Sequence, residues 1–504
     1  MSANSQKEFG LLRSFFWPIH SYELKKVLPM FFMFFCILFN YTVMRDTKDG
    51  LVVTNCGAEA LPFLKLFGVL PGAVIFMLIY AKLSNLLSKE KLFYAAISPF
   101  LVFFALFAIA IYPYKDILHF SSLGPYLREV LPSGFKGAVG ALENWTFSLF
   151  FVMAELWGSV VLSLLFWGFA NDTTRTSEAK RFYSLFGLGG NASLIFSGLF
   201  IMWASSVQAS PGVDPTQVSL NYMMSIVVLL GLSIMGTFYW MYRNVLTDPL
   251  LYDTTEKKVK KKKPKLSLKE SFGFLLKSKY ICCIAVLVIA YGIGINLVEV
   301  TWKGQLKQQY TNVNDYTSFM GSFSMIVGTV TICMYFVGGF IIRKFGWLTG
   351  AIATPLMLLL TGLAFFIFTI FSDSFSGIVG ILGTTPLMLT VLFGAAQNIV
   401  SKSTKYSLFD PTKEMAYIPL DEESKVKGKA AIDVVGARLG KSGGSLLNML
   451  LIIALGSLEA ITPFLTILLV IVMFTWMFSA KTLNGLLKKL HMDKEESEKE
   501  EATS

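Results

Sequence analysis

The sequence predicts an all-α membrane protein with twelve transmembrane helices in two six-helix halves. Of its 504 residues, 54% are hydrophobic and 15% are charged, which makes the chain more apolar and less charged than a typical soluble domain. Apolar runs of roughly 20 residues, the length that crosses a bilayer, recur along the chain. A lysine-rich segment in the middle separates these runs into two equal groups.

The first group of runs follows a short N-terminal segment, residues 1–26, which has no cleavable signal or transit peptide. Six apolar runs then form the N-terminal half, 27–242, at about 27–44, 62–87, 92–112, 145–170, 182–204 and 220–242. Six more form the C-terminal half, 280–484, at about 280–302, 318–342, 347–371, 377–401, 429–455 and 460–484. The remaining tail, 485–504, is charged and of low complexity, and we expect it to be disordered.

The segment 243–279 joins the two halves. Seven lysines lie between Lys257 and Lys265, so this segment cannot enter hydrocarbon and must lie in water. Lysine runs also occur in nucleic-acid-binding proteins, but in a membrane protein they fix the topology. We therefore interpret the segment as a cytoplasmic hinge and the net charge of +11 as topological, and we expect no nucleic-acid partner.

The distribution of basic residues predicts the orientation of the chain. Loops on the hinge side of the predicted spans hold 24 lysines and arginines. The opposite loops hold seven, namely Arg45, Lys48, Lys115, Arg128, Lys136, Lys303 and Lys307. The positive-inside rule then puts both termini and the hinge in the cytoplasm.

Two six-helix halves joined by a long cytoplasmic hinge are the layout of the major-facilitator architecture, whose halves are parallel repeats. A weak internal repeat agrees with this interpretation, because 187–193 aligns with 438–444 at a shift of about 251 residues. Both stretches are rich in glycine and serine. Small residues let helices approach closely, so the two stretches are expected to be packing faces or parts of the transport pathway.

Metal, cofactor and ATPase chemistry have little support in the sequence. The five cysteines show no CxxC spacing and the three histidines lie far apart, so we assign no metal and no cofactor. The segment 436–442 approaches a phosphate-binding Walker motif, but Val435 stands where the motif requires glycine. The motif also needs a preceding strand, whereas this segment lies in a predicted membrane helix, and we expect no enzyme activity.

Charged residues inside the predicted spans indicate a transport function. An ionised side chain at the bilayer centre costs on the order of 3 kcal/mol, so it persists only where it meets a cavity or a partner. Such residues fall in both halves: Lys65, Glu155, Glu299, Asp433, Arg438 and Lys441. Glu155 and Lys441 lie well inside their spans and are the strongest pathway candidates. Lys65 and Glu299 lie near span ends, where long side chains can reach water. Asp433 and Arg438 can pair on one helix. Intramembrane cations suit an anionic substrate, and lysine and arginine both bind phosphate.

Six stretches carry a family resemblance: CILFNYTVMRDTKDGLVVT (36–54), GAEALPFLK (57–65), FVMAELWGSVVLSLLFWGFAN (151–171), AKRFYSLFGLGGNASLIFSG (179–198), GINLVEVTWK (294–303) and KYSLFDPTKEMAYIPLDEESKVKGKAAIDVVGARLGKSGGS (405–445). They resemble the nucleotide transporters, or ATP/ADP translocases, of obligate intracellular bacteria and plastids. The resemblance covers nearly the whole chain. It implies an antiporter that exchanges external ATP for internal ADP, with phosphate leaving alongside, and so imports energy from a host cell.

The resemblance also implies which residues carry transport. By motif context, the four charged positions that are essential in the family are Lys65, Glu155, Glu299 and Lys441. Secondary candidates from the same motifs or spans are Arg45, Asp46, Lys48, Asn296, Lys303, Asp433 and Arg438. We expect a monomer in the lipid bilayer of a bacterial inner membrane. Two alternatives stay open: import of other nucleoside triphosphates, with or without protons, and a structural or receptor-like membrane protein, against which the intramembrane charges argue.

Overall fold

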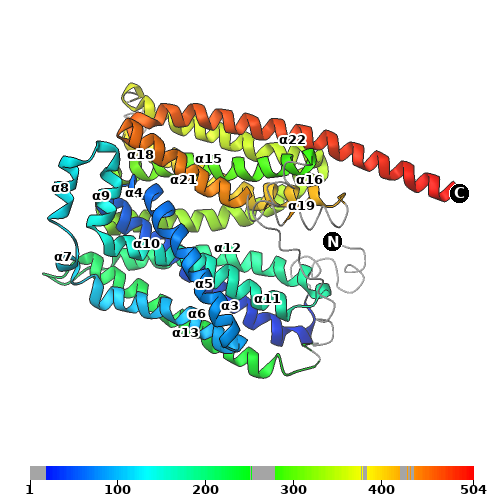
Figure 1. The fold of residues 1–504 in the computed structure, drawn as a ribbon, viewed down its shortest axis with the longest axis horizontal. Helices are drawn as coiled ribbons and strands as arrows, with labels where there is room; N and C mark the ends of the chain where they lie inside the picture. Colours follow the sequence, from blue (N-terminus) through cyan, green and yellow to red (C-terminus); the bar gives the residue numbers. More distant parts are fainter. Residues whose placement is uncertain are drawn as a thin grey trace.

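The computed structural model describes residues 19–249, 251–252, 278–375, 377, 383–420, 428–429, 432 and 436–503. Every element in this part of the chain is helical (Figure 1). The elements of the N-terminal half are η1 (Ser21–Glu23), α3 (Leu24–Cys56), α4 (Ala60–Phe63), η2 (Leu64–Val69), α5 (Leu70–Leu86), α6 (Lys89–Leu106), η3 (Phe107–Ile111), α7 (Lys115–Leu118), α8 (Leu123–Val130), η4 (Ser133–Phe135), α9 (Lys136–Glu143), α10 (Trp145–Trp157), η5 (Gly158–Phe166), α11 (Trp167–Thr173), α12 (Thr176–Ser206) and α13 (Pro215–Asn244).

Within its described residues, the C-terminal half has fewer and longer helices than the N-terminal half. They are α15 (Lys279–Gln309), α16 (Val313–Ile370), η7 (Ser372–Phe375), α18 (Pro386–Thr404), η8 (Lys405–Phe409), α19 (Asp410–Tyr417), α21 (Ala437–Leu455) and α22 (Leu458–Thr503). Within the described residues, nine helices are long and apolar enough to cross a membrane. The all-helical membrane fold is therefore confirmed.

Helix α16 is too long to be a single membrane span. Its 58 residues would extend about 87 Å at 1.5 Å per residue, nearly three times the hydrocarbon thickness. Gly346 breaks the helix with a φ of 82°, a left-handed conformation that glycine adopts without steric cost. The contact between Ile342 and Gly350, eight residues apart, shows that the chain folds back there. In a straight helix these residues would lie about 12 Å apart.

The two halves repeat one packing relation. In the N-terminal half α12 packs on α3, and in the C-terminal half α21 packs on α15. The glycine-rich stretches lie at these contacts: Gly190 lies against Leu38 of α3, and Gly440 lies against Gly292 of α15 so closely that a Cβ on Gly292 would be 2.7 Å from the Gly440 backbone. Of the two expected roles, a packing face and a part of the transport pathway, these contacts support the packing role at Gly190 and Gly440.

Three helices run further than the sequence predicts. Helix α3 continues through the charged stretch 45–49 to Cys56, α15 continues to Gln309, and the run from Pro386 continues through η8 and α19 to Tyr417. The assignment of Arg45, Lys48 and Lys303 to loops is therefore wrong, as is the assignment of Lys402 to a cytoplasmic loop. Hydropathy ends a span where charges begin, whereas Arg45, Lys48 and Lys303 are paired inside the protein, and the helices continue past all four basic residues.

The charged tail is also helical where disorder was expected. Helix α22 continues without a break to Thr503 (Figure 1). Glutamate and lysine are good helix formers, and Glu495 stands four residues before Lys499, a spacing that stabilises helices. The N-terminal segment 1–18 and most of the predicted hinge, including 253–277, lie outside the described residues.

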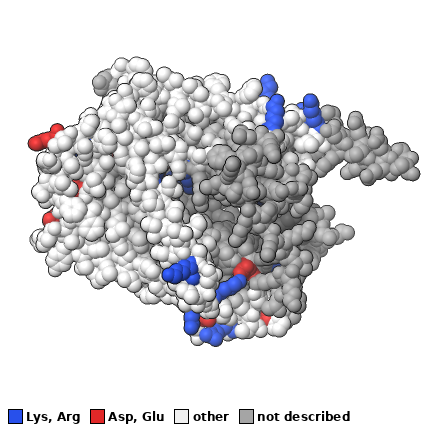
Figure 2. Space-filling view, in the orientation of Figure 1, with Lys and Arg blue, Asp and Glu red and all other residues white. Residues whose placement is uncertain are grey.

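Uncharged side chains dominate one face of the molecule. On the face drawn in Figure 2, they cover most of the described surface on the left, and the lysines and arginines lie at the lower middle and the upper right, with one group near the centre. Large apolar side chains on this surface are exposed, among them Ile79, Leu106, Leu229 and Phe478. Exposed apolar side chains of this size suit a lipid environment.

Candidate functional site

The stretch RDTKDG, residues 45–50, is the centre of the candidate site. It lies inside α3, and Lys48 and Asp49 are almost completely buried, with side chains 2% exposed. Lys48 binds Asp49 at 2.8 Å and Glu155 of α10 at 3.0 Å, and its ammonium stands 4.0 Å from the centre of the Phe151 ring. A buried lysine thus has two carboxylate partners and an aromatic face.

The ion pairs continue from α3 into the C-terminal half. Asp49 binds Lys303 of α15 at 2.8 Å, Lys303 binds Glu299 one turn earlier at 2.8 Å, and Glu299 binds Lys65 of η2 at 3.1 Å. Acids and bases therefore alternate along one chain of contacts, in the order Glu155, Lys48, Asp49, Lys303, Glu299 and Lys65. We call these six residues the ionic chain.

The ionic chain crosses between the halves twice. The first crossing is the Asp49–Lys303 pair, and the second is the Lys65–Glu299 pair, in which Lys65 also donates to the side-chain oxygen of Asn296 at 3.1 Å. Three predicted residues, Lys65, Glu155 and Glu299, are between 23% and 27% exposed at the side chain, whereas Lys303 is 4% exposed. The predicted residues are thus the accessible members of a largely buried network.

A second contact between the halves lies beside the ionic chain. Arg45 binds Asp46 at 2.9 Å and donates to the hydroxyl of Ser324 on α16 at 2.7 Å, and that hydroxyl donates to Asp46 at 2.6 Å. The predicted candidates Arg45 and Asp46 thus act as one unit with a serine of the other half.

Lys441 lies in the first turns of α21 and is exposed. Two hydrogen bonds hold this part of α21 against α15. The Ser445 hydroxyl donates to the side-chain oxygen of Asn296 at 3.5 Å, and the side-chain amide of Asn448 donates to the backbone oxygen of Asn296 at 2.9 Å. Within the described residues, no acidic side chain pairs with the Lys441 ammonium. Asp433 lies outside the described residues, and Arg438 is described only as backbone, so neither is placed relative to Lys441.

Interrupted helix geometry accompanies the charged positions. Lys65 lies inside the π-helical segment η2, and the π-helical segment η5 begins three residues after Glu155. A π turn inserts an extra residue into a helix and is found most often at functional sites. In both places the irregular turn changes the direction of side chains near a charged residue.

Sequence reasoning did not single out three residues of this region, Asp49, Ser324 and Lys402. Asp49 follows Lys48 directly, so its place in the same charged stretch was a usable signal. Ser324 is one of many serines, and only the fold brings it to Arg45. Lys402 was set aside because hydropathy put the end of its span at residue 401.

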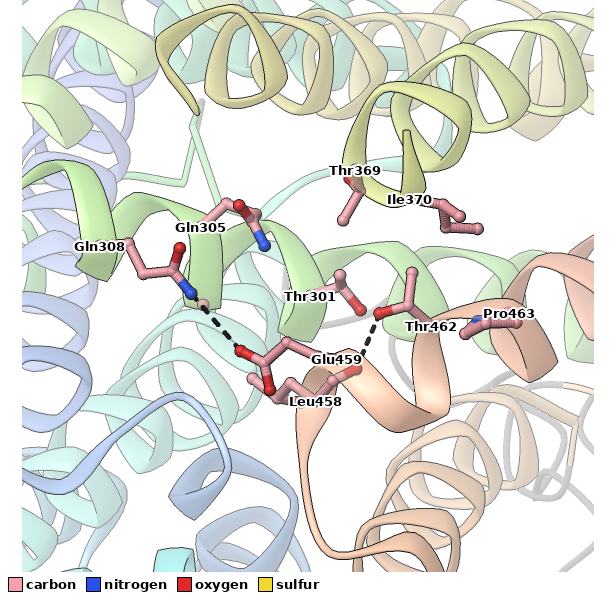
Figure 3. A pocket seen from close by; sticks show the side chains of 10 residues that line it. Thr301, Gln305, Gln308, Thr369, Ile370, Leu458, Glu459, Thr462 and Pro463 are labelled. Atoms are coloured by element: carbon pink, nitrogen blue, oxygen red, sulfur yellow. Dashed lines mark hydrogen bonds between the residues drawn. The ribbon is translucent and has the colours of Figure 1, made fainter. Parts of the chain in front are cut away.

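The pocket drawn in Figure 3 is separate from the ionic chain, since none of its lining residues belongs to that chain. It has a volume of about 200 Å³ and lies between α15, α16 and α22, lined by residues such as Thr301, Gln305, Thr369 and Glu459. Its polar contacts include a Gln308–Glu459 hydrogen bond of 3.5 Å. Ligand pockets of drug-sized molecules begin at about 300 Å³, so this pocket is too small for a nucleotide.

A metal site has no support in the described part of the chain, where no group of three or more histidine, cysteine or acidic residues could hold an ion. The donor set of the ionic chain is instead composed of lysines and carboxylates that satisfy one another. Such a set can bind an anion when a carboxylate is displaced from its lysine, and it can bind a cation only when a lysine moves away.

Comparison with known proteins gives a consistent result. Residues 2–486 match the family model described as TLC ATP/ADP transporter. The chain is 58% identical to "ADP,ATP carrier protein 1" of Chlamydia muridarum, covering 100% of this chain and 96% of that protein. It is 52% identical to "ADP,ATP carrier protein 1, chloroplastic" of Arabidopsis thaliana, covering 95% of this chain and 77% of that protein.

Solved structures show the fold. A crystal structure of the nucleoside transporter NupG aligns with a TM-score of 0.57 at 9% identity, covering 90% of this chain and 99% of that chain. Sequence identity this low carries no information about substrate. The structural likeness supports a fold like that of major-facilitator transporters.

Proposed function

Because this chain belongs to the TLC ATP/ADP transporter family, we propose that it is a membrane antiporter that exchanges ATP for ADP. Its relatives are named for that exchange. The protein binds, moves and releases its substrate without chemical change. In an intracellular bacterium, ATP enters and ADP leaves, so that the exchange brings in energy from the host cell.

The proposed membrane arrangement has twelve spans. The nine membrane-length helices include α16, which Gly346 divides into two; the helical run 386–417 and the helix that contains α21 supply the other two. An even number puts both termini and the hinge on one side. The excess of lysine in the hinge indicates the cytoplasmic side of a bacterial inner membrane. The transporter acts as a monomer in the lipid bilayer.

The observation that carries the proposal is the ionic chain, which crosses between the halves at Asp49–Lys303 and Lys65–Glu299. In a two-half transporter, alternating access is a movement of one half against the other around a central site. Any movement that separates α3 from α15 must break the Asp49–Lys303 pair. If the substrate replaces one partner of an ion pair between the halves, its binding loosens the contact between them. These ion pairs are therefore suited to couple substrate binding to movement.

The contacts between α21 and the N-terminal half support a state closed to the outside. Helix α21 packs on α4, η2 and η4, near the end where α7, α8 and α9 lie (Figure 1). By contrast, α5, which continues from η2 towards the other end, has no buried residue and packs mainly on its own half. The substrate then enters and leaves this state from the cytoplasm.

Phosphate binding explains how substrate can open the closed end. The phosphate chain of a nucleotide competes with the carboxylate of Glu299 for the ammonium of Lys65, since both are anions that accept from lysine. Lys441, which has no acidic partner among the described residues, offers a second point charge. Without an anion the lysines return to the carboxylates and the halves stay together, which favours exchange over one-way transport.

Glu155 has a different role from the lysines. As an anion it cannot bind phosphate, but it holds Lys48 at 3.0 Å, and Lys48 in turn holds Asp49. Without Glu155, Asp49 would be the one carboxylate left to Lys48 in the ionic chain. Lys48 would then compete more strongly with Lys303 for Asp49. We also propose that phosphate leaves together with ADP.

Proteoliposomes test the proposed function. The purified protein is reconstituted into liposomes loaded with ADP, with ATP, or with buffer alone, and uptake of labelled ATP is measured. We expect uptake only into nucleotide-loaded liposomes. A panel of other nucleoside triphosphates inside the liposomes gives the specificity. Equal uptake into empty liposomes, or better exchange of another nucleoside triphosphate than of ATP, contradicts the proposal.

A further inference from the structure

Lys402 is a partly buried cation for which neither the sequence motifs nor the ionic chain accounts. The helical run formed by α18, η8 and α19 continues without a break from Pro386 to Tyr417. Lys402 is 16 residues from the start of that run, about 24 Å at 1.5 Å per residue, and 15 residues from its end. The lysine therefore lies near the middle of this continuous helical run, two residues before the end of its apolar first part, α18, at Thr404.

The surroundings of Lys402 come from both halves of the protein. Its side chain is half-buried, and its ammonium lies 4.8 Å from the centre of the Phe323 ring on α16. The charges that act on it most strongly are those of Arg45, Glu299, Lys303 and Asp46. Lys402 thus faces the region where the ionic chain and the Arg45–Asp46–Ser324 unit meet.

Every acid near Lys402 already has a basic partner. Glu299 binds Lys303 and Lys65, and Asp46 binds Arg45. Within the described residues, no carboxylate forms an ion pair with Lys402. The five bases of this region, Arg45, Lys48, Lys65, Lys303 and Lys402, therefore face four acids, Asp46, Asp49, Glu155 and Glu299.

A structural role accounts poorly for this arrangement. A cation–π contact is a weaker compensation for a buried charge than a hydrogen-bonded carboxylate. The neighbouring Lys405 shows the structural solution, because it binds Asp410 on its own helix at 2.7 Å. A partly buried cation that has no acidic partner among the described residues is suited to bind a mobile anion.

We propose that Lys402 contacts the phosphate chain of the transported nucleotide. This inference rests on the proposed ATP/ADP exchange. Lys402 would give the phosphate chain a contact on α18 of the C-terminal half, whereas Arg45 and Lys65 belong to the N-terminal half. The bound phosphate chain supplies the negative charge that the acids of the region lack.

The test compares Lys402→Gln with Lys402→Arg and with Lys344→Gln. Lys344 is a matched control, since it too stands over phenylalanine rings, 5.3 Å from Phe340 and 5.5 Å from Phe345, but it is exposed. ATP/ADP exchange in proteoliposomes gives KM and maximal rate for each variant. Thermal shift of the detergent-purified protein gives binding of ATP, ADP, inorganic phosphate and adenosine.

We expect Lys402→Gln to weaken ATP and ADP binding about tenfold or more, the effect of losing one charge-assisted hydrogen bond. Its melting temperature without ligand should be equal to or above that of the wild type, because an uncompensated charge has been removed. Lys402→Arg should retain most of the affinity, and Lys344→Gln should behave as the wild type.

Three outcomes overturn the inference. One is a lower melting temperature of Lys402→Gln with unchanged ATP and ADP binding, which identifies a structural lysine. Another is a loss confined to inorganic phosphate, which identifies a site for the free ion. The third is an equal loss of ATP and ADP affinity in Lys402→Arg and Lys402→Gln. In each case continued exchange by the wild type and by Lys344→Gln leaves the proposed function intact, whereas failure of exchange in the wild type refutes that function itself.

Discussion

The Asp49–Lys303 pair makes a specific prediction about stability. Both side chains are nearly inaccessible, at 2% and 4% exposed, and their charged atoms are 2.8 Å apart. The pair also holds α3 of one half against α15 of the other. We consider the single variants Asp49→Asn and Lys303→Gln and the double variant that carries both changes.

The magnitudes follow from the charges that each variant leaves behind. Removing one partner of a buried ion pair costs about 3 to 5 kcal/mol. In Lys303→Gln, Asp49 retains Lys48 and Glu299 retains Lys65, so we expect the lower end, about 3 kcal/mol. In Asp49→Asn the ionic chain is left with three lysines and two carboxylates, so the unbalanced charge is positive. The expected loss of stability is similar.

The double variant should be more stable than addition of the two losses predicts. With both charges gone, the ionic chain divides into two balanced pairs, Glu155–Lys48 and Glu299–Lys65, which the structure already holds at 3.0 Å and 3.1 Å. We therefore expect a total loss near that of one single variant. The coupling energy should then approach 3 kcal/mol, the upper part of the range for residues in contact.

Denaturant unfolding in mixed micelles measures this double-mutant cycle. The pair Lys405 and Asp410 is the control, because its side chains are 26% and 31% exposed and belong to one helical run. For that partly exposed pair we expect a coupling below about 1 kcal/mol. Losses for Asp49→Asn and Lys303→Gln that add within about 0.5 kcal/mol would show that the two charges act independently and would refute the reasoning.

Three further predictions concern transport. Lys441→Gln should abolish or greatly weaken exchange while the protein still inserts, and Lys441→Arg should restore it only in part, because a planar fork replaces a point charge; full ATP binding by Lys441→Gln in a thermal-shift assay would contradict this. Glu299→Gln frees Lys65 from its carboxylate and should permit leak of ATP into empty liposomes, whereas a tight, inactive carrier would refute the proposed competition at Lys65. Replacing three of the lysines between 257 and 265 by glutamine should leave the KM for ATP unchanged in correctly inserted protein, and a tenfold rise would show that the hinge contributes to binding.

Much of the candidate site was predictable from single residues. Lys65, Glu155 and Glu299 stood out because a charge in an apolar run requires a partner, and the structure supplies partners for all three. Lys48 and Lys303 were secondary candidates and are instead the most buried bases of the network. Hydropathy had assigned both to loops, since it scores each residue as if it faced lipid or water alone.

The sequence by itself determined the all-helical membrane class, because the hydrophobic effect acts on local composition and needs no knowledge of neighbours. It also indicated that charges inside the spans need partners. Only the tertiary structure decided which charge meets which. Asp49 and Lys303 are 254 positions apart, and Ser324 is 279 positions from Arg45, so no local pattern can connect them. Coulomb attraction depends on distance in space, and helix packing sets that distance: it leaves Asp49 between two lysines and Lys402 without an acid among the described residues.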